Sequence, residues 1–364
     1  MANGAAAVAR PLTDHFSSDY ATARKRFRRA ADAAGARRES LALAATGPDG
    51  ARLTIDIAWL GEPDARHVLL HTSGIHGVEA FAGSAVQLAV LDDVPAVVPG
   101  RAVVLVHVLN PYGMAWLRRT NENNVDLNRN FLGGDERWAG APPLYAALDE
   151  LLNPPGPPRR DAFLWRALLR VLRYGYPAVK QAVAQGQYDF PRGLFYGGAR
   201  IEEGPRVLLA WLASQLSRAQ RIVAIDVHTG LGTWAADTLL VEPGYRAPPA
   251  LAGALQRPLV DSASGKAESY VVKGGLAAGV RRALPHAEIH ALVQEFGTYS
   301  VVKVISALRD ENRAHFHAAS ALGHPAKSAL RRALCPEDSS WRAAVVERGV
   351  SAVRAAYTWL QREE

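Results

Sequence analysis

The chain alternates short apolar runs with amphipathic segments along most of its length. Short apolar runs between turn-forming residues are typical of buried strands, whereas apolar positions three and four apart are typical of helices. These patterns predict strands at 40–45, 52–60, 67–72, 102–109, 221–227, 238–241 and 287–293. They predict helices at 19–34, 79–91, 163–172, 206–219, 301–317 and 340–360. Between the first two strands, Gly47-Pro48-Asp49-Gly50 predicts a hairpin turn.

Apolar strands that alternate with helices indicate an α/β fold. We expect one domain, 1–364, with a mixed, mostly parallel, twisted sheet and helices on both faces. The segment 133–205 differs, because it combines proline-rich loops, an apolar helix and a run rich in glycine and aromatic residues. It is interpreted as an insertion of helix and loop, whose aromatic residues contribute to the core more often than to a substrate surface. The segment 320–364 is expected to be a C-terminal helical extension.

Composition narrows the class of protein. A hydrophobic content of 49% with 21% charged residues indicates a globular protein and excludes a disordered one. The net charge of +7 is spread over the chain, and its densest cluster, 24–29, is interpreted as a solvated helix face, so we expect no nucleic-acid partner. Cys335 is the only cysteine, which excludes an intrachain disulfide. Neither a signal peptide nor a membrane-spanning run is apparent, so we expect a cytoplasmic location and no membrane partner.

Candidate metal ligands follow three of the predicted strands. His76 and Glu79 come directly after the strand at 67–72, His228 follows the strand at 221–227, and Glu295 follows the strand at 287–293. Open α/β sheets bind ligands at the carboxyl ends of their strands. Zinc takes nitrogen and oxygen ligands and keeps one open position in catalytic sites. Each motif alone is weak, but their convergence favours a metal site. Asp226 is a candidate partner for His228, unless its side chain points to the other face of its strand.

A polar segment at 121–131 contains Asn128 and Arg129. It is either a solvated loop or a site that binds a carboxylate, for which arginine offers a bidentate fork and asparagine a further donor. The histidines His71 and His107 lie within apolar strands, and we interpret them as hydrogen-bonded core residues and not as further ligands.

These elements together resemble the zinc carboxypeptidase superfamily, whose best-known branch is carboxypeptidase A-like. The matching elements are His76-x-x-Glu79, the string Asp126-Leu127-Asn128-Arg129-Asn130-Phe131, His228 and Glu295, in that order. The resemblance covers about residues 53–316. The runs 76–84 and 193–198 further resemble a bacterial group of unknown function within that superfamily.

The resemblance implies a site with one Zn²⁺ ion. His76, Glu79 and His228 would be its ligands. Glu295 would act as general base toward the attacking water and then as the acid that protonates the leaving amine.

The resemblance also implies how a substrate is held. Asn128 and Arg129 would bind its carboxylate, and either Arg118 or Arg119 would stabilise the oxyanion of the tetrahedral intermediate. The family has a mobile tyrosine before the catalytic glutamate, and the candidates here are Tyr270 and Tyr245.

The function implied is a zinc-dependent metallocarboxypeptidase that cleaves a peptide or amide bond next to a free carboxylate. One alternative is an N-acyl-amino-acid deacylase, similar to the aspartoacylase and succinylglutamate desuccinylase branch. A second alternative is a catalytically silent binding module, although such modules usually lose a ligand or the base. The expected partner is a small peptide or an acyl-amino-acid with a free carboxylate.

Overall fold

An eight-stranded mixed sheet forms the centre of the computed structural model, which describes residues 11–265, 270–318 and 322–362. Its strands are β1 (Arg37–Thr46), β2 (Arg52–Gly61), β3 (His67–Ser73), β4 (Arg101–His107), β5 (Arg221–Trp234), β6 (Asp237–Val241), β7 (Leu259–Asp261) and β8 (Glu288–Gly297). The spatial order is β1-β2-β4-β3-β5-β8-β6-β7. The four central strands β4, β3, β5 and β8 run parallel, and antiparallel pairings flank them. The prediction of a mixed, mostly parallel sheet is confirmed.

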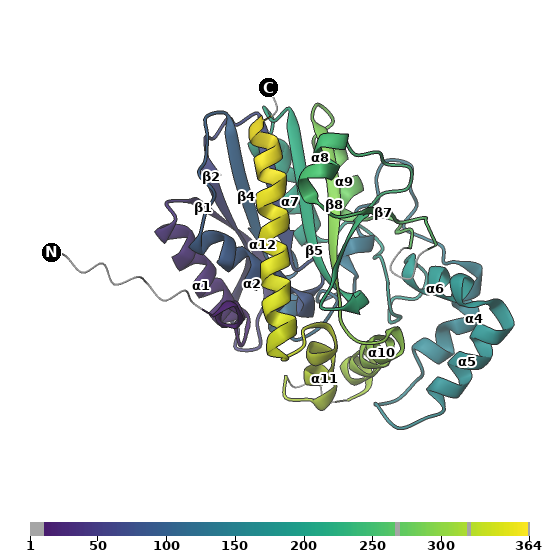
Figure 1. Ribbon diagram of the computed structural model, residues 1–364. Coiled ribbons are helices and arrows are strands. Elements are labelled where there is room, and N and C mark those ends of the chain that lie inside the picture. Colours follow the sequence, from purple (N-terminus) through teal and green to yellow (C-terminus); the bar gives the residue numbers. More distant parts are fainter. Residues whose placement is uncertain (1–10, 266–269, 319–321, 363–364) are drawn as a thin grey trace.

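Helices cover both faces of the sheet (Figure 1). They are α1 (Tyr20–Ala33), α2 (Ala80–Asp92), α3 (Pro111–Ala115), α4 (Pro143–Leu152), α5 (Phe163–Tyr174), α6 (Tyr176–Ala184), α7 (Glu203–Gln215), α8 (Pro249–Leu255), α9 (Leu276–Ala283), α10 (Val301–His317), α11 (Pro325–Leu334) and α12 (Ser339–Arg362). Neighbouring strand residues point to opposite faces. Leu69 therefore packs with α1, α2, α8 and α12, whereas Leu70 packs with α7 and α9. Among the described residues, no helix is long and apolar enough to cross a membrane.

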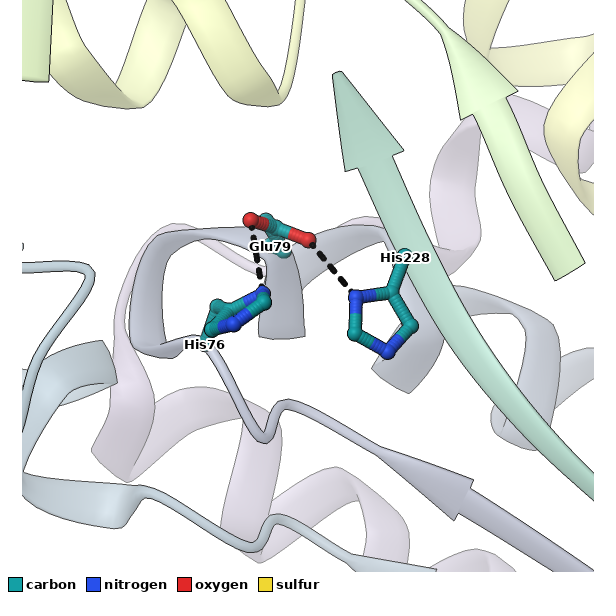
Figure 2. A group of neighbouring side chains, drawn as sticks. All are labelled: His76, Glu79 and His228. Carbon is teal, nitrogen blue, oxygen red and sulfur yellow. Dashed lines mark ion pairs between the residues drawn. The ribbon is translucent and has the colours of Figure 1, made fainter. Parts of the chain in front are cut away.

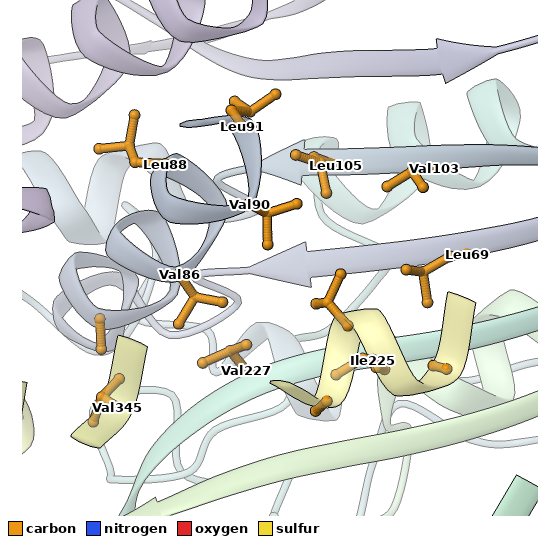
Figure 3. Packing of buried hydrophobic residues seen from close by; sticks show 14 of the residues in the cluster. Leu69, Val86, Leu88, Val90, Leu91, Val103, Leu105, Ile225, Val227 and Val345 are labelled. Atoms are coloured by element: carbon orange, nitrogen blue, oxygen red, sulfur yellow. The ribbon is translucent and has the colours of Figure 1, made fainter. Parts of the chain in front are cut away.

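The C-terminal helix α12 is part of the main core. It lies across one face of the sheet in Figure 1, and its Trp341, Val345 and Val353 are buried with residues of α2, β3 and β5 (Figure 3). A Cβ added at Gly349 would come within 2.5 Å of Val86 on α2, so the two helices pack backbone to side chain at this point. The part of 320–364 that the structure describes therefore closes one layer of the domain.

The segment 133–205 contributes no named strand and holds α4, α5 and α6. These helices lie beside the sheet, at its carboxyl-end side in Figure 1, and pack with α10 in a separate apolar cluster. Its interpretation as an insertion into the domain stays a prediction.

Two buried histidines make the stability depend on pH. His71 and His107 are fully buried, and each has one ring nitrogen without a hydrogen-bond partner. Burial lowers the pKa of each to about 4, so the unfolded chain takes up protons first as the pH falls below 6.5. Each histidine is therefore expected to lower the free energy of unfolding by about 2 kcal/mol between pH 7 and pH 5.

His107→Gln tests this prediction, because glutamine keeps a polar end for Ser84, which lies 2.9 Å from the His107 Nε2. Urea unfolding at both pH values should show a loss of stability on acidification that is smaller in the variant by about 2 kcal/mol. An equal loss in both proteins would mean that His107 already takes up a proton in the folded state.

Candidate functional site

Three side chains at the carboxyl edge of the central strands form a group that can hold a metal ion. His76 lies in the loop after β3, Glu79 just before α2, and His228 within β5 (Figure 2). All three are buried, and one ligand atom from each lies within 4.8 Å of the others. Glu79 sits between the histidines, with Oε1 3.0 Å from the Nδ1 of His76 and Oε2 3.6 Å from the Nδ1 of His228. The structure thus brings together the three predicted ligands.

Two further carboxylates orient the histidine rings. The Nε2 of His76 lies 3.0 Å from Asp126, and the Nε2 of His228 lies 2.6 Å from Asp226. The Nε2 of His76 also lies 2.8 Å from the guanidinium of Arg119, which can only donate, so Asp126 and Arg119 compete for that nitrogen. The Nδ1 of each ring faces Glu79, on the side from which a metal ion would bind. The Nδ1 of His76 is buried and has no well-directed hydrogen bond despite its short distance to Glu79. Two imidazole nitrogens and a carboxylate therefore fit a zinc ion.

The charges around the group keep its carboxylates ionised. Burial raises the pKa of Glu79, but His76 and Arg119 outweigh burial and lower it to about 2. Burial likewise opposes the ionisation of Asp126, whose pKa Arg129 and Arg119 nevertheless hold well below its usual range. A buried, ionised carboxylate between two imidazole rings is a donor set that a divalent cation can bind.

Glycines explain why the first motif folds as it does. A Cβ at Gly77 would collide with the backbone of Gly113, which lies in the short helix α3. Gly77 and Val78 also donate backbone hydrogen bonds to the carbonyls of Arg119 and Arg118. Glycine between His76 and Glu79 thus lets the loop after β3 lie directly against the segment that carries the arginines.

Glu295 lies beside the ligand group. It is the register partner of His228 on the neighbouring parallel strand β8, and it is buried. Its Oε1 accepts a hydrogen bond from the backbone of Leu231 at 2.9 Å. Burial raises the pKa of Glu295 to about 7. The neighbouring His228 opposes this rise, and the negative charge of Glu79 adds to it. A carboxylate with such a pKa can accept and return a proton near neutral pH.

The two neighbouring arginines have different surroundings. Arg119 donates to Glu79 at 2.7 Å and to Asp126 at 3.1 Å, so its guanidinium lies against the ligand group. Arg118 points away and pairs with Glu311 at 2.9 Å. Glu311 also pairs with the buried Lys327, which makes this a charge network in the core. Of the two candidates, Arg119 is therefore the one placed at the site.

The predicted carboxylate-binding pair lies one layer deeper. The Oδ1 of Asn128 accepts a hydrogen bond from Leu276, at the start of α9. Arg129 has no exposed surface and donates to the carbonyls of Ala184 and Asn128. The ring of Tyr270 lies 5.8 Å from the Arg129 guanidinium. Arg129 is therefore covered on all sides in this conformation.

Tyr270 and the other tyrosine candidate, Tyr245, occupy different places. Tyr270 lines a cavity beside Glu295, and burial raises its pKa. The hydroxyl of Tyr245 instead lies 2.6 Å from the Nδ1 of His290, and the ring packs with the core on the opposite face of the sheet. Tyr270 alone is thus placed at the site.

A cavity of about 500 Å³ opens beside the ligand group. His228, Glu295 and Asn128 form its polar end. The rest is mostly apolar and comes from one face of β3, β5 and β8 and from α9, with Leu70, Ala224, Ala291, Val293, Leu276 and Val280. A volume of this size is in the range of small-molecule sites.

Two contributors to the site had no role assigned from the sequence. Asp126 was noted only as part of the motif string. The signal that could have singled it out is its spacing, because Asp126 stands two positions before Asn128, as Asp226 stands two positions before His228. Phe195 belongs to the predicted insertion, yet its ring lies 5.3 Å from the Arg119 guanidinium and 5.6 Å from that of Arg129. No pattern in the sequence links such a distant aromatic residue to these arginines.

The comparisons agree with this picture. A family model described as "Protein of unknown function (DUF2817)" matches residues 16–348, so the chain belongs to that family. No curated protein matches it. Among solved structures, bovine thrombin-activatable fibrinolysis inhibitor in complex with tick carboxypeptidase inhibitor is similar, with 10% identity, a TM-score of 0.53, and coverage of 96% of this chain and 99% of that one.

Two further structures are similar over most of this chain. Carboxypeptidase A from Helicoverpa armigera has 14% identity and a TM-score of 0.47, with 95% of this chain and 75% of that one covered. Murein-tripeptide amidase MpaA from Escherichia coli O157 has 17% identity and a TM-score of 0.36, with 79% and 92% covered. The likeness to the bovine protein shows a carboxypeptidase-type fold. The predicted assignment to a family of unknown function is confirmed by the family model, and the fold is of the type expected for that family.

Proposed function

We propose that this protein is a zinc-dependent hydrolase that cleaves a peptide or amide bond next to a free carboxylate. The observation that carries the proposal is the convergence of His76, Glu79 and His228, with Glu295 beside them. Of these four residues, His228 and Glu295 line the cavity. A catalytically silent binding module would not need all four of these side chains. All four are present in this chain.

The protein's own residues can supply most of the chemistry. His76, Glu79 and His228 would hold the metal, which when bound polarises a carbonyl and makes water more acidic. Glu295 accepts the proton of the attacking water and returns it to the leaving nitrogen. Arg119 donates hydrogen bonds to the oxyanion that develops on the former carbonyl oxygen.

Substrate binding would use the cavity and the residues behind it. Asn128 reaches the cavity directly, whereas Arg129 adds positive charge from beneath it. For Arg129 to contact a substrate carboxylate, Tyr270 has to move aside, as proposed for the mobile tyrosine of this fold. The apolar wall would then hold the side chain next to the carboxylate.

The cavity also suits an N-acyl-amino-acid, so a deacylase of the same fold is the second candidate. Incubation of the zinc-loaded protein with short peptides and with N-acyl-amino-acids separates the two. Release of C-terminal amino acids from peptides is the expected result. Turnover of acyl-amino-acids alone would replace the carboxypeptidase assignment by the deacylase.

The two arginines are expected to respond differently to substitution. Arg119→Gln should lower kcat by about 10²–10³-fold, because it removes a donor to the oxyanion. Arg118→Gln should leave kcat within a few-fold but lower the free energy of unfolding by about 2 kcal/mol, because it removes one of the two cations that pair with the buried Glu311 and leaves only Lys327. Steady-state kinetics and urea unfolding of both variants check this. The opposite pattern would assign the catalytic role to Arg118.

A further inference from the structure

Helix α5 exposes an unusual apolar face. Its residues Phe163 and Ala167 pack inward with α4 and α10. With 3.6 residues per turn, positions 164, 168, 172, 165 and 169 lie next to one another on the outward side. Their exposed fractions are 60% for Leu164, 63% for Trp165, 46% for Leu168, 47% for Leu169 and 72% for Leu172. We call these five residues the α5 apolar face. It contains five of the most exposed large apolar side chains of the described chain.

Positive charge borders the α5 apolar face. Arg166 and Arg173 follow it around the helix, and Arg159 and Arg160 precede the helix. Between 159 and 180 the sequence has six basic residues and a single acidic one, Asp161. Asp161 is paired with Arg309 and Arg313 of α10, so its charge is compensated inside the protein. The outward side of α5 is therefore both apolar and cationic.

The helix lies at the outer edge of the molecule. In Figure 1, α5 is the outermost element on the side of α4 and α6, away from the sheet. Tyr176, at the start of α6, adds a further exposed aromatic residue next to it. A contiguous exposed apolar surface of this kind marks a contact surface.

We propose that the α5 apolar face docks onto the surface of a membrane that contains anionic lipids. A helix with tryptophan and leucine on one side and arginine at its border lies in the interface of such a bilayer, with its apolar side among the acyl chains. Tryptophan and tyrosine favour the same depth. Such binding is peripheral, and it departs from the sequence-based expectation of no membrane partner. The proposal does not rest on the hydrolase function.

A second copy of the chain is a poorer occupant. In a symmetric contact, the same surface meets itself, so Arg166 and Arg173 of one copy would approach their counterparts on the other. Anionic lipid headgroups supply instead both the negative charge and the apolar depth. The next helix, α6, packs against α5 and carries Gln181, which lines the cavity, so α6 connects the docking helix to the candidate active site.

Vesicle flotation tests the proposal. The full chain is expected to float with vesicles of phosphatidylglycerol and phosphatidylcholine, to bind pure phosphatidylcholine much more weakly, and to lose affinity at high salt. Leu164→Gln combined with Leu172→Gln should weaken binding to the anionic vesicles at least about tenfold. Val302→Gln, at a half-exposed apolar position on α10, is the matched control and should bind as the parent does.

A second readout does not depend on that double variant. Cys335 is buried and is the only cysteine, so Leu168→Cys in a Cys335→Ser background allows a single environment-sensitive dye on α5. A blue shift of its emission with anionic vesicles is expected. The proposal is overturned if the parent chain fails to float, or if the double variant floats as well as the parent. It is also overturned if the parent is a dimer that the double variant makes monomeric while neither binds vesicles, because the α5 apolar face then joins two copies.

Discussion

Glu295→Gln is expected to lower kcat for amide hydrolysis by at least about 10²-fold, with little change in KM. Glutamine keeps the size of the side chain and can still contact the backbone of Leu231, but it cannot take a proton from water or return one to the leaving nitrogen. The protein should bind its metal as before, because Glu295 is not one of the three ligands. Steady-state kinetics with a peptide substrate, together with metal analysis, measure both quantities.

The matched control is Glu288→Gln, at the exposed start of the same strand β8, where hydrolysis should be unchanged.

In the parent enzyme, kcat/KM should rise with pH as Glu295 ionises. Burial raises the pKa of Glu295 to about 7, and a bound divalent cation lowers it, so the acid limb should lie at or below pH 7. Hydrolysis by Glu295→Gln at the parent rate would remove Glu295 from the mechanism.

His228→Ala is expected to abolish both metal binding and hydrolysis. It removes one of the three proposed ligands and leaves Glu79 and His76 to hold the ion. Loss of a residue that only hydrogen-bonds a ligand typically lowers metal affinity by about 10–100-fold. The affinity of His228→Ala for zinc should fall by more than that. Asp226→Asn, which perturbs only the hydrogen bond to the Nε2 of His228, should give an intermediate loss within that range.

Competition with a fluorescent zinc chelator measures these affinities. His286→Ala is the control, because His286 precedes the amino end of β8, opposite to the ligands, and its Nε2 lies 3.2 Å from the carbonyl oxygen of Leu216. It should bind zinc as the parent does. Unchanged affinity in His228→Ala would show that the ion, if bound, lies elsewhere.

The sequence predicted the central part of the fold well. Strands at the centre of a parallel sheet are apolar throughout, so β3, β4, β5 and β8 were recognisable as continuous apolar runs. The short edge strand β7 was missed, because three residues carry no periodicity. The helices α4, α6, α8, α9 and α11 were not predicted, because proline, glycine or loop residues interrupt their patterns.

The grouping of His76, Glu79 and His228 was predictable, because their spacing relative to strand ends is encoded locally. The choice between Arg118 and Arg119 was not, since adjacent residues point in different directions and only the fold shows which way. The orientation of Asp226 was open for the same reason, and the alternation along β5 places it on the side of His228. The burial of Arg129 depends on distant parts of the chain that no local pattern encodes.

Helix α5 shows the opposite failure of sequence reasoning. Its apolar content was interpreted as core packing, which holds for Phe163 but not for Trp165. An apolar pattern shows that a side chain avoids water, but it does not show whether the protein itself or another surface covers it. Only the position of α5 at the edge of the molecule shows that the protein itself does not cover these side chains.

His76, Glu79 and His228 are proposed to bind one metal ion, which anomalous diffraction at the zinc edge can locate in crystals of the protein purified with zinc. We expect one peak per chain at about 2.0–2.2 Å from the Nδ1 atoms of both histidines and the carboxylate of Glu79. A zinc peak bound by other residues, or well-ordered His76, Glu79 and His228 with no peak between them, would contradict it.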